Sequence, residues 1–262
     1  MHANSRMLAN IVRQMCPPLL WSTAKKVRDA YFPVTEVPRY YGLLELDRKL
    51  EQYVDYDHGF FVELGGWDGI TFSNSLYLER HRGWTGLLIE PAPTEYVKCK
   101  RNRPLASVHC CACVPFDFSE QFVHMTFCAS MTAAHSTASE RSALSDVPNH
   151  LESGRQFLAP DESVYEFGAI AKPLSHVLDE AAVTREIDLL ILDVEGFEMQ
   201  VLRGIDFLRH RPKFICVEVR DLGPIEQLLK VHGYRVEAQL TDYVDNKDFL
   251  FRRNSSETRD LR

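Results

Sequence analysis

The segment Val62–Gly69 (VELGGWDG) places two carboxylates and three glycines close together in the sequence. Glu63 precedes the first glycine, and Asp68 stands just before the last one. Glycine allows a tight turn and lets a ligand approach the backbone closely. Two carboxylates at such a turn repel a pyrophosphate and attract a cation. We therefore interpret the segment as a binding turn for a cationic ligand, with the glycines Gly65, Gly66 and Gly69.

The glycine spacing distinguishes this turn from two common nucleotide-binding motifs. Gly65–Gly69 (GGWDG) lacks the G-x-G-x-x-G pattern of dinucleotide sites, and the chain contains no G-x-x-x-x-G-K-[ST]. S-adenosylmethionine carries a positively charged sulfonium and an ammonium group, which suit the two acids. The turn therefore favours S-adenosylmethionine over NAD as the cofactor.

Three further acids stand at the ends of two apolar segments. Glu90 is one of them, and an acid at this place can accept hydrogen bonds from ribose hydroxyls. Asp193 and Glu195 follow Leu189–Leu192 and stand where open α/β sheets bind ligands. Both are candidates for a catalytic base or a metal ligand, and capping of the next helix is the alternative. The sequence leaves a requirement for a divalent metal open.

These side chains need a sheet that brings the ends of their strands together. Apolar segments that alternate with helical patterns predict a mostly parallel sheet with helices on both faces. The predicted strands are Phe60–Leu64, Thr85–Glu90, Ala106–Val114, Ile187–Asp193, Lys213–Val219, Tyr234–Leu240 and Lys247–Arg252. The last two form a hairpin, which gives the sheet one antiparallel strand at its edge. The predicted helices include Thr71–His81, Thr94–Arg101, Leu174–Ala182, Glu198–Leu208 and Pro224–His232.

The connections between these elements predict the domain organisation. Residues 1–38 are interpreted as an N-terminal arm, residues 39–253 as one α/β domain, and residues 254–262 as a disordered polar tail. The span 115–185 is too long for a simple connection. We expect it to be an insertion that holds an added strand within Gln121–Cys128 and contacts the substrate as a lid.

For three other groups of side chains, we favour a structural role over a functional one. His124 and His135 in the insertion are alternative bases, although a single histidine in a loop is usually a surface residue. The basic run Lys98–Arg103 (KCKRNR) suits a phosphorylated ligand, but a solvated helix end is the favoured interpretation. The group Cys110–Cys113 lacks the spacing of a zinc site and is interpreted as buried thiols.

The composition excludes several classes of protein. Of the 262 residues, 45% are hydrophobic and 26% are charged, as in an ordinary globular protein. The formal net charge of −7 argues against a nucleic-acid-coating or polybasic membrane-binding protein. No apolar stretch approaches the roughly 20 residues of a membrane span. Reduced thiols and the lack of a span predict a cytoplasmic protein.

Three segments together resemble one known family. They are Phe60–Ser75 (FFVELGGWDGITFSNS), Gly83–Pro91 (GWTGLLIEP) and Asp188–Gly204 (DLLILDVEGFEMQVLRG). In this order, and over about Tyr40–Arg252, the chain is similar to the FkbM methyltransferases. The resemblance implies a Rossmann-like class I methyltransferase fold with a seven-stranded sheet. One departure, Gly66–Trp67 where many members carry Ala-Asn, concerns the wall of the cofactor pocket.

The resemblance also implies residue roles and an activity. Ser73 and Asn74 match a family Ser-Asn pair near the site, and S-adenosylmethionine would lie at Glu63, Gly65, Asp68, Gly69 and Glu90. Members typically methylate hydroxyl groups, which implies O-methylation of a sugar or polysaccharide precursor, or of a secondary metabolite. Methylation of nitrogen or carbon, and a non-catalytic binding or scaffolding role, stay open. The expected partner is a small-molecule acceptor rather than a nucleic acid, and a homodimer stays open as well.

Overall fold

The computed structural model describes residues 39–134, 154–243 and 246–254. The chain divides into two units, Met1–Arg39 and Tyr40–Arg262, and every described helix and strand belongs to the second unit. The predicted N-terminal arm, His135 and residues 255–262 of the predicted tail lie outside the described residues. Within the described ranges, no helix has both the length and the apolar character that crossing a membrane requires.

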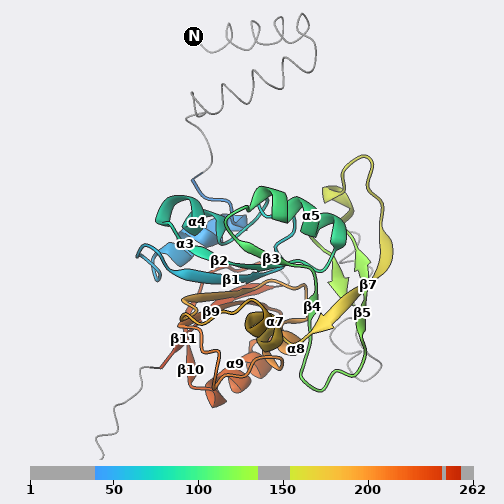
Figure 1. Cartoon of the computed structure of the whole chain (residues 1–262). Coiled ribbons are helices and arrows are strands. Elements are labelled where there is room, and N and C mark those ends of the chain that lie inside the picture. Colours follow the sequence, from blue (N-terminus) through green and yellow to red (C-terminus); the bar gives the residue numbers. More distant parts are fainter. Residues whose placement is uncertain (1–38, 135–153, 244–245, 255–262) are drawn as a thin grey trace, which may run out of the picture. The chain divides into compact units, whose positions relative to one another are not determined.

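A seven-stranded sheet forms the centre of the second unit, in the order β10-β11-β9-β8-β1-β2-β3 (Figure 1). Only β11 runs antiparallel to its neighbours, and it lies between β9 and the edge strand β10. The prediction of a seven-stranded, mostly parallel sheet with one antiparallel strand near its edge is confirmed. The strands are β1 (Phe60–Leu64), β2 (Thr85–Ile89), β3 (Ser107–His109), β8 (Leu189–Leu192), β9 (Phe214–Val219), β10 (Tyr234–Gln239) and β11 (Lys247–Arg253).

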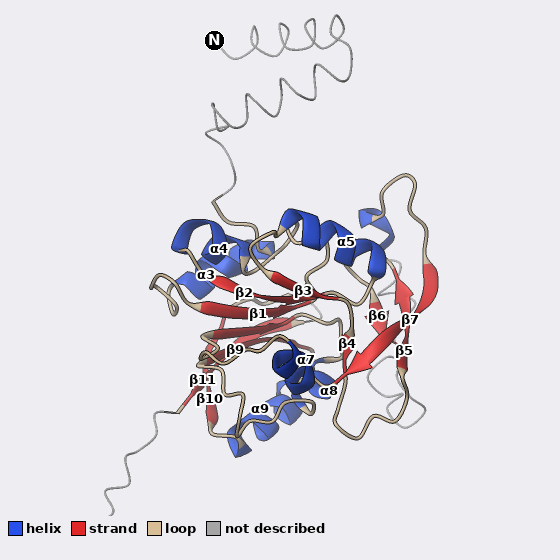
Figure 2. Ribbon diagram, in the orientation of Figure 1, coloured by secondary structure: helices blue, strands red, loops and turns tan. Residues whose placement is uncertain are grey.

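Helices cover both faces of the sheet (Figure 2). Leu50 of α3, Leu78 of α4 and Cys99 of α5 belong to the apolar core on one face. Leu202 of α8 and Leu229 of α9 belong to the core on the other face, together with α7. Because both faces are covered, the central strands are apolar at successive positions. The helices are η1 (Leu43–Glu45), α3 (Leu46–Glu51), α4 (Leu76–Arg82), α5 (Pro93–Asn102), η2 (Arg155–Phe157), α7 (Leu174–Glu180), α8 (Glu198–Leu202) and α9 (Leu222–Val231).

The strand order opens a crevice between β1 and β8. From β1 the chain continues to β2 and β3 on one side, whereas β8 continues to β9 on the other side. Ligands of open α/β sheets bind at such a reversal, outside the carboxyl ends of the strands. Leu64 pairs with both Ile89 and Leu192, so three strands end at the same level. The residues that follow these strand ends are Gly65, Glu90 and Asp193.

A second, four-stranded sheet has the order β4-β7-β5-β6. The prediction of one strand over Ala106–Val114 is wrong, because β3 pairs with β2 in the main sheet and β4 pairs with β7 in the second sheet. The predicted strand within Gln121–Cys128 is β5, but β7 was not predicted. Its sequence has apolar residues at alternate positions, Tyr165, Phe167, Ala169 and Ala171, which is a strand pattern, although Gly168 and Ile170 make the intervening positions less polar. These strands are β4 (Ala112–Cys113), β5 (Phe122–Phe127), β6 (Ala133–Ala134) and β7 (Tyr165–Lys172).

The predicted helix Thr71–His81 begins later than expected, at Leu76. Phe72 has a φ of 58°, in the left-handed region, and so cannot belong to a right-handed helix. Ser73, Asn74 and Ser75 form a turn that hydrogen bonds to the Glu63 carboxylate instead. The start of α4 is therefore set by a side chain of β1 rather than by local helix propensity.

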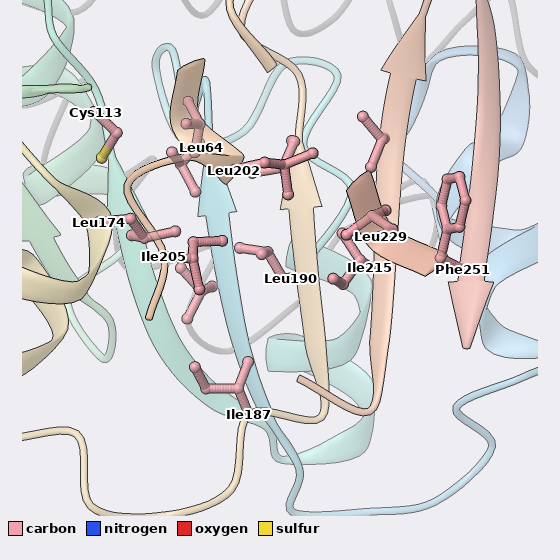
Figure 3. Close-up of a cluster of buried hydrophobic side chains, with 14 of the residues drawn as sticks. Leu64, Cys113, Leu174, Ile187, Leu190, Leu202, Ile205, Ile215, Leu229 and Phe251 are labelled. Carbon is pink, nitrogen blue, oxygen red and sulfur yellow. The ribbon is translucent and has the colours of Figure 1, made fainter. Parts of the chain in front are cut away.

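The core on the α7, α8 and α9 face provides a test of the fold. Leu190, which is 1% exposed, lies there among Leu202, Ile205 and Ile215 (Figure 3). Leu190→Ala leaves a cavity in a well-packed site, so we expect it to lower the free energy of unfolding by about 2–5 kcal/mol. Urea denaturation followed by circular dichroism measures this change. Leu208→Ala is the matched control, because Leu208 is 93% exposed and its truncation should change stability by less than about 0.5 kcal/mol.

Candidate functional site

A cavity of about 270 Å³ lies at the carboxyl ends of β1, β2 and β8. The predicted site residues that line it are Glu63, Gly65, Asn74, Glu90, Asp193 and Glu195. The other predicted residues, Gly66, Asp68, Gly69 and Ser73, are not among its lining residues. Two unpredicted acids, Glu218 at the end of β9 and Asp248 in β11, complete the wall. Among the described residues, six acids thus face one small space.

Gly65 brings the ends of β1 and β8 together. Its φ is +83°, and a Cβ atom at this position would lie 1.9 Å from the backbone oxygen of Asp193. No other residue type fits this contact without moving one strand. The predicted turn glycine therefore shapes the floor of the cavity by close backbone packing as well as by its conformation.

Glu90 is a buried carboxylate at the end of β2. Its Oε2 accepts a hydrogen bond from the backbone N–H of Trp67 at 2.9 Å, and its Oε1 accepts one from Ala92 at 2.8 Å. Burial nevertheless raises the pKa of Glu90 to about 7. The side chain is thus fixed against the glycine turn, and its ionised form can accept hydrogen bonds from hydroxyl groups of a ligand.

Glu63 is also buried, and it holds the segment that precedes α4. Its Oε1 accepts a hydrogen bond from the backbone N–H of Asn74 at 2.7 Å. Its Oε2 accepts hydrogen bonds from the hydroxyls of Ser73 at 3.0 Å and Ser75 at 2.5 Å. A carboxylate has about four acceptor sites. Glu63 can therefore anchor this segment and still present an acceptor to the cavity that it lines.

Asp68 stabilises the turn from within. Its Oδ1 accepts hydrogen bonds from the backbone N–H groups of Ile70 at 2.8 Å and Thr71 at 2.7 Å, and its Oδ2 accepts one from the Thr71 hydroxyl at 2.8 Å. These bonds are those of an aspartate turn, in which the side chain replaces a backbone acceptor. The Asp68 carboxylate therefore bonds to the turn itself, whereas the sequence predicted that it contacts the cofactor.

Asn74 supplies a polar group that the described protein leaves unsatisfied. It is 4% exposed and lines the cavity, yet its Oδ1 accepts no hydrogen bond from any described residue. An unpaired buried polar atom costs roughly 1–3 kcal/mol unless a ligand or water supplies the partner. The oxygen has almost no accessible surface and lies against Gly42, where a Cβ atom would be 2.5 Å from it, so it is enclosed by the protein.

The acids after β8 influence each other's protonation. Burial, and then the Asp248 and Glu198 carboxylates, raise the pKa of Asp193 to about 8. Burial and the Asp193 charge raise the pKa of Glu195 well above its usual value, and Arg220 offsets part of this shift. Because several carboxyls share this wall, protons remain bound there near neutral pH.

Glu198 holds the turn between β8 and α8. Its Oε1 accepts hydrogen bonds from the backbone N–H groups of Val194 at 3.2 Å and Gly196 at 3.0 Å. The alternative for Asp193 and Glu195 was capping of α8, but the N-cap residue of this helix is Phe197, and its side chain makes no capping hydrogen bond. Glu195 has a φ of 56°, and residues held in this region of backbone space cluster at functional sites.

Sequence reasoning missed Glu218 and Asp248, although signals for both exist. Glu218 stands near the carboxyl end of β9, the same position that identified Glu90 and Asp193. Asp248 stands near the start of β11, and an antiparallel strand begins at the edge where its parallel neighbours end. Burial, and then Asp193 and Glu195, raise the pKa of Glu218 to about 10.

An aromatic group forms another part of the cavity wall. The ring centroids of Trp67, Phe72 and Phe157 lie 5.8 to 6.5 Å apart, and all three residues line the cavity. Trp67 and Phe72 have φ angles of 41° and 58°, which are uncommon for bulky residues. This group was not predicted, because Phe157 comes from the η2 segment, which is distant in the sequence.

Other candidates from the sequence lie elsewhere. His124 is exposed and contacts Glu166 at 3.2 Å, away from the cavity lining. Lys98 contacts Glu95 and Glu162, whereas Arg103 is fully buried rather than part of a solvated helix end. Within the part of the chain that the structure describes, no group of three or more His, Cys, Asp or Glu side chains could hold a metal ion.

Comparison with known proteins assigns the chain to a family. The profile of the "Methyltransferase FkbM domain" matches residues 63–236, from the glycine turn to β10. The chain belongs to the FkbM methyltransferase family. FkbM proteins are methyltransferases that depend on S-adenosylmethionine, and this is the cofactor that the acids of the glycine turn predict. The predictions of the family, the cofactor and the enzyme class are confirmed.

The chain is also similar to one curated protein and to several solved structures. "Methyltransferase 1" of Beauveria bassiana (strain ARSEF 2860) is 28% identical over 201 residues, which cover 71% of this chain and 76% of the relative. A precorrin-6y C5,15-methyltransferase structure from Geobacter metallireducens GS-15 is 10% identical over 80% of this chain and 87% of that one, with a TM-score of 0.42. An RNA methyltransferase from Salinibacter ruber, in complex with S-adenosyl-L-homocysteine, is 13% identical over 83% and 95% of the two chains, with a TM-score of 0.39.

The residues of this FkbM chain fit S-adenosylmethionine. Gly65 lets the ends of β1 and β8 approach each other at the cavity, and the acids around the cavity suit the positive charges of the cofactor. Glu90 lines the cavity and presents a carboxylate that suits hydroxyl groups. When bound, the cofactor supplies a methyl group on a positively charged sulfur.

The position of Glu90 leads to a binding prediction. Its ionised form accepts stronger hydrogen bonds than a neutral amide, so Glu90→Gln should weaken binding of S-adenosylhomocysteine about tenfold at pH 8. The affinity of the unmodified protein should rise as pH increases through about 7, where Glu90 ionises. Calorimetric titration at several pH values measures both effects. Equal affinities at pH 8 would contradict the contact, and Glu180→Gln on the exposed surface of α7 is the control.

Glu218 gives a prediction for stability without any ligand. Its folded-state pKa of about 10 lies far above the value near 4.3 of an unfolded glutamate. Between these values the folded protein binds more protons than the unfolded chain, so stability falls as pH rises. Glu218→Gln removes this loss and should gain at most about 1.4 kcal/mol per pH unit over the original protein between pH 6 and 8. Urea denaturation at each pH tests this, with the exposed Glu226→Gln as the control.

Proposed function

We propose that this methyltransferase transfers the methyl group to a hydroxyl oxygen of a small acceptor, a sugar or polysaccharide precursor or a secondary metabolite. The observation that carries the proposal is the acid wall formed by Asp193, Glu195, Glu218 and Asp248. Carboxyl groups accept hydrogen bonds in both protonation states and donate one when protonated, and a hydroxyl group can donate and accept. A wall of this kind beside the cofactor site suits an acceptor that carries several hydroxyls.

Asp193 is the proposed base. Transfer to a hydroxyl forms the new oxygen–carbon bond, breaks the sulfur–carbon bond of the donor and releases the hydroxyl proton. A general base works best when its pKa lies near the working pH, and the pKa of Asp193 is raised to about 8. Glu195 follows it at the same edge and would hold and orient the acceptor hydroxyl. Activity assays with and without magnesium test whether these acids also require a divalent metal.

The cofactor half of the site is assigned in the same way. We assign Glu63 to the ammonium group of the donor and Glu90 to its ribose hydroxyls, with Gly65 and Asn74 beside them. The remaining predicted residues stabilise the turn without lining the cavity, and we assign them an indirect role in donor binding. They are Gly66, Asp68, Gly69 and Ser73.

The insertion is proposed to form the acceptor side of the cavity. Met125 of β5, the segment Ala129–Thr132 and Phe157 of η2 line it and all belong to residues 115–185. This supports the proposed lid, in which apolar side chains exclude water from the reacting atoms. We propose the N-terminal arm, residues 1–38, either as a dimer contact or as a further cover of the cavity.

A cytoplasmic location accords with the cysteines. The six cysteines of the described residues are free, and five of them are buried. Free thiols of this kind persist in a reducing compartment. Size-exclusion chromatography with light scattering, on the full chain and on a chain without residues 1–38, tests the proposed homodimer.

Two measurements test the proposed activity. Calorimetric titration with S-adenosylhomocysteine, against NAD as the control ligand, first establishes the donor site. The protein is then incubated with methyl-labelled S-adenosylmethionine and three matched acceptor sets that carry hydroxyl, amine or activated carbon groups, with and without magnesium. Label on the hydroxyl set supports the proposal, and label only on amines or carbon overturns it. Donor binding without transfer to any set would favour the scaffolding alternative.

Asp193→Asn separates chemistry from donor binding. Asparagine keeps the shape of the side chain but cannot accept a proton, so kcat should fall by about a hundredfold or more. The affinity for S-adenosylhomocysteine should change far less, and the rise of kcat toward pH 8 should disappear. Equal losses in both quantities would move Asp193 to the donor site instead. Asp221→Asn is the control, because asparagine caps α9 as well as aspartate does.

A further inference from the structure

Arg103, at the end of α5, is an arginine with no exposed surface. All five N–H groups of its guanidinium have an acceptor within reach. Nε and Nη2 approach Glu79 Oε2 at 3.0 Å each. The other contacts are Nη1 to the backbone oxygen of Gly69 at 3.1 Å, Nη1 to Ser73 Oγ at 3.0 Å and Nη2 to Ser75 Oγ at 2.9 Å. A buried charge is tolerated only with such complete pairing.

The two serines connect this arginine to Glu63. Arginine donates and never accepts, so each serine oxygen that contacts Arg103 must use its own hydrogen elsewhere. Both hydroxyls direct that hydrogen to Glu63 Oε2. The guanidinium itself is 3.9 Å from the same oxygen. Arg103 therefore fixes the orientation of both hydroxyls, and through them the Glu63 carboxylate.

The same guanidinium packs against β1 and against the glycine turn. It lies over the ring of Phe61 in β1, with 5.3 Å from its central carbon to the ring centroid. A Cβ atom on Gly69, whose φ is +81°, would lie 2.8 Å from Arg103 Cγ. Gly69 thus makes room for the arginine, which gives this turn glycine a role that does not require contact with the cofactor.

We propose that Arg103 is the positioning residue of the donor site, holding the Glu63 carboxylate oriented through Ser73 and Ser75 so that it can receive the ammonium group of S-adenosylmethionine. The inference rests on the proposed role of Glu63 and is independent of the acceptor. Lysine cannot replace Arg103, because an ammonium group has three donors and lacks the planar fork that reaches both serines and Glu79 at once.

The experiment compares Arg103→Lys and Arg103→Met with Lys213→Met. Lys213 forms an ion pair with the buried Asp188 at 2.7 Å, near the amino end of β8 and away from the cavity lining. All variants are measured as full-length proteins without acceptor, by calorimetric titration with S-adenosylhomocysteine from pH 5 to pH 9. Hydrogen exchange of residues 66–75 is measured on the same free proteins.

Both Arg103 variants should bind S-adenosylhomocysteine roughly tenfold to a hundredfold more weakly. The loss of affinity on the acid side should begin at a higher pH, because a proton competes better for a carboxylate that has lost its cation. Other titratable groups that interact with Glu63 are Asp193 of the β8 end, Cys99 of α5 and Cys216 of β9, and none of them is altered. Exchange of residues 66–75 should accelerate, whereas Lys213→Met should leave all three measurements unchanged.

A purely structural role would give a different result. Lower stability with an unchanged acid limb of the binding profile would overturn the proposal, and so would an affinity equal to that of the original protein. Ser75→Ala keeps the buried charges and removes one connecting hydroxyl, so it covers the case in which the Arg103 variants do not fold. It should shift the acid limb in the same direction by a smaller amount, and no shift in this variant contradicts the connection.

Discussion

Carboxyl groups that share a small, poorly hydrated cavity cannot all be ionised near neutral pH, because each charge raises the cost of the next one. Asp193, Glu195 and Glu218 are in this situation, as their raised pKa values show. Parallel strands create it, since their carboxyl ends meet at one edge and β11 adds Asp248 from the opposite direction. A cation bound beside this wall would relieve the repulsion, so the proposed donor site predicts that cofactor binding and the protonation of these acids are coupled.

The partners that stabilise the Glu63 carboxylate differ from those of the other acids. Two hydroxyls and a backbone N–H contact its oxygens, and a buried guanidinium stands behind the hydroxyls. Its neighbours are supplied by β1, α5 and the segment before α4, so the local fold and the cofactor site depend on the same bonds. For the acids after β8, burial and mutual repulsion raise the pKa values, and the charge of Arg220 offsets only part of the shift of Glu195. One edge of the sheet therefore contains carboxyls suited to binding charge and carboxyls suited to accepting a proton.

The sequence predicted features that depend on local pattern. Alternating apolar segments were sufficient for the seven-stranded sheet, and acids at strand ends were sufficient for Glu90 and Asp193. It failed where distant segments decide the outcome. Arg103 was predicted to belong to a basic run on the surface. Only the folded chain brings it to Glu63 and Glu79. The start of α4 was misplaced for the same reason, and Phe157 joins Trp67 and Phe72 only through the insertion.

The change of sheet between β3 and β4 has a consequence for how such an enzyme can diversify. Only Cys110 and Cys111 separate a strand of the main sheet from a strand of the second one. The second sheet carries Met125 to the cavity, while Glu63, Glu90 and Arg103 belong to the main sheet and its helices. With the proposed assignment, substitutions and length changes in the second sheet would leave the residues assigned to the donor unchanged. A single scaffold of this kind allows selection to change what is methylated while the methyl source stays the same.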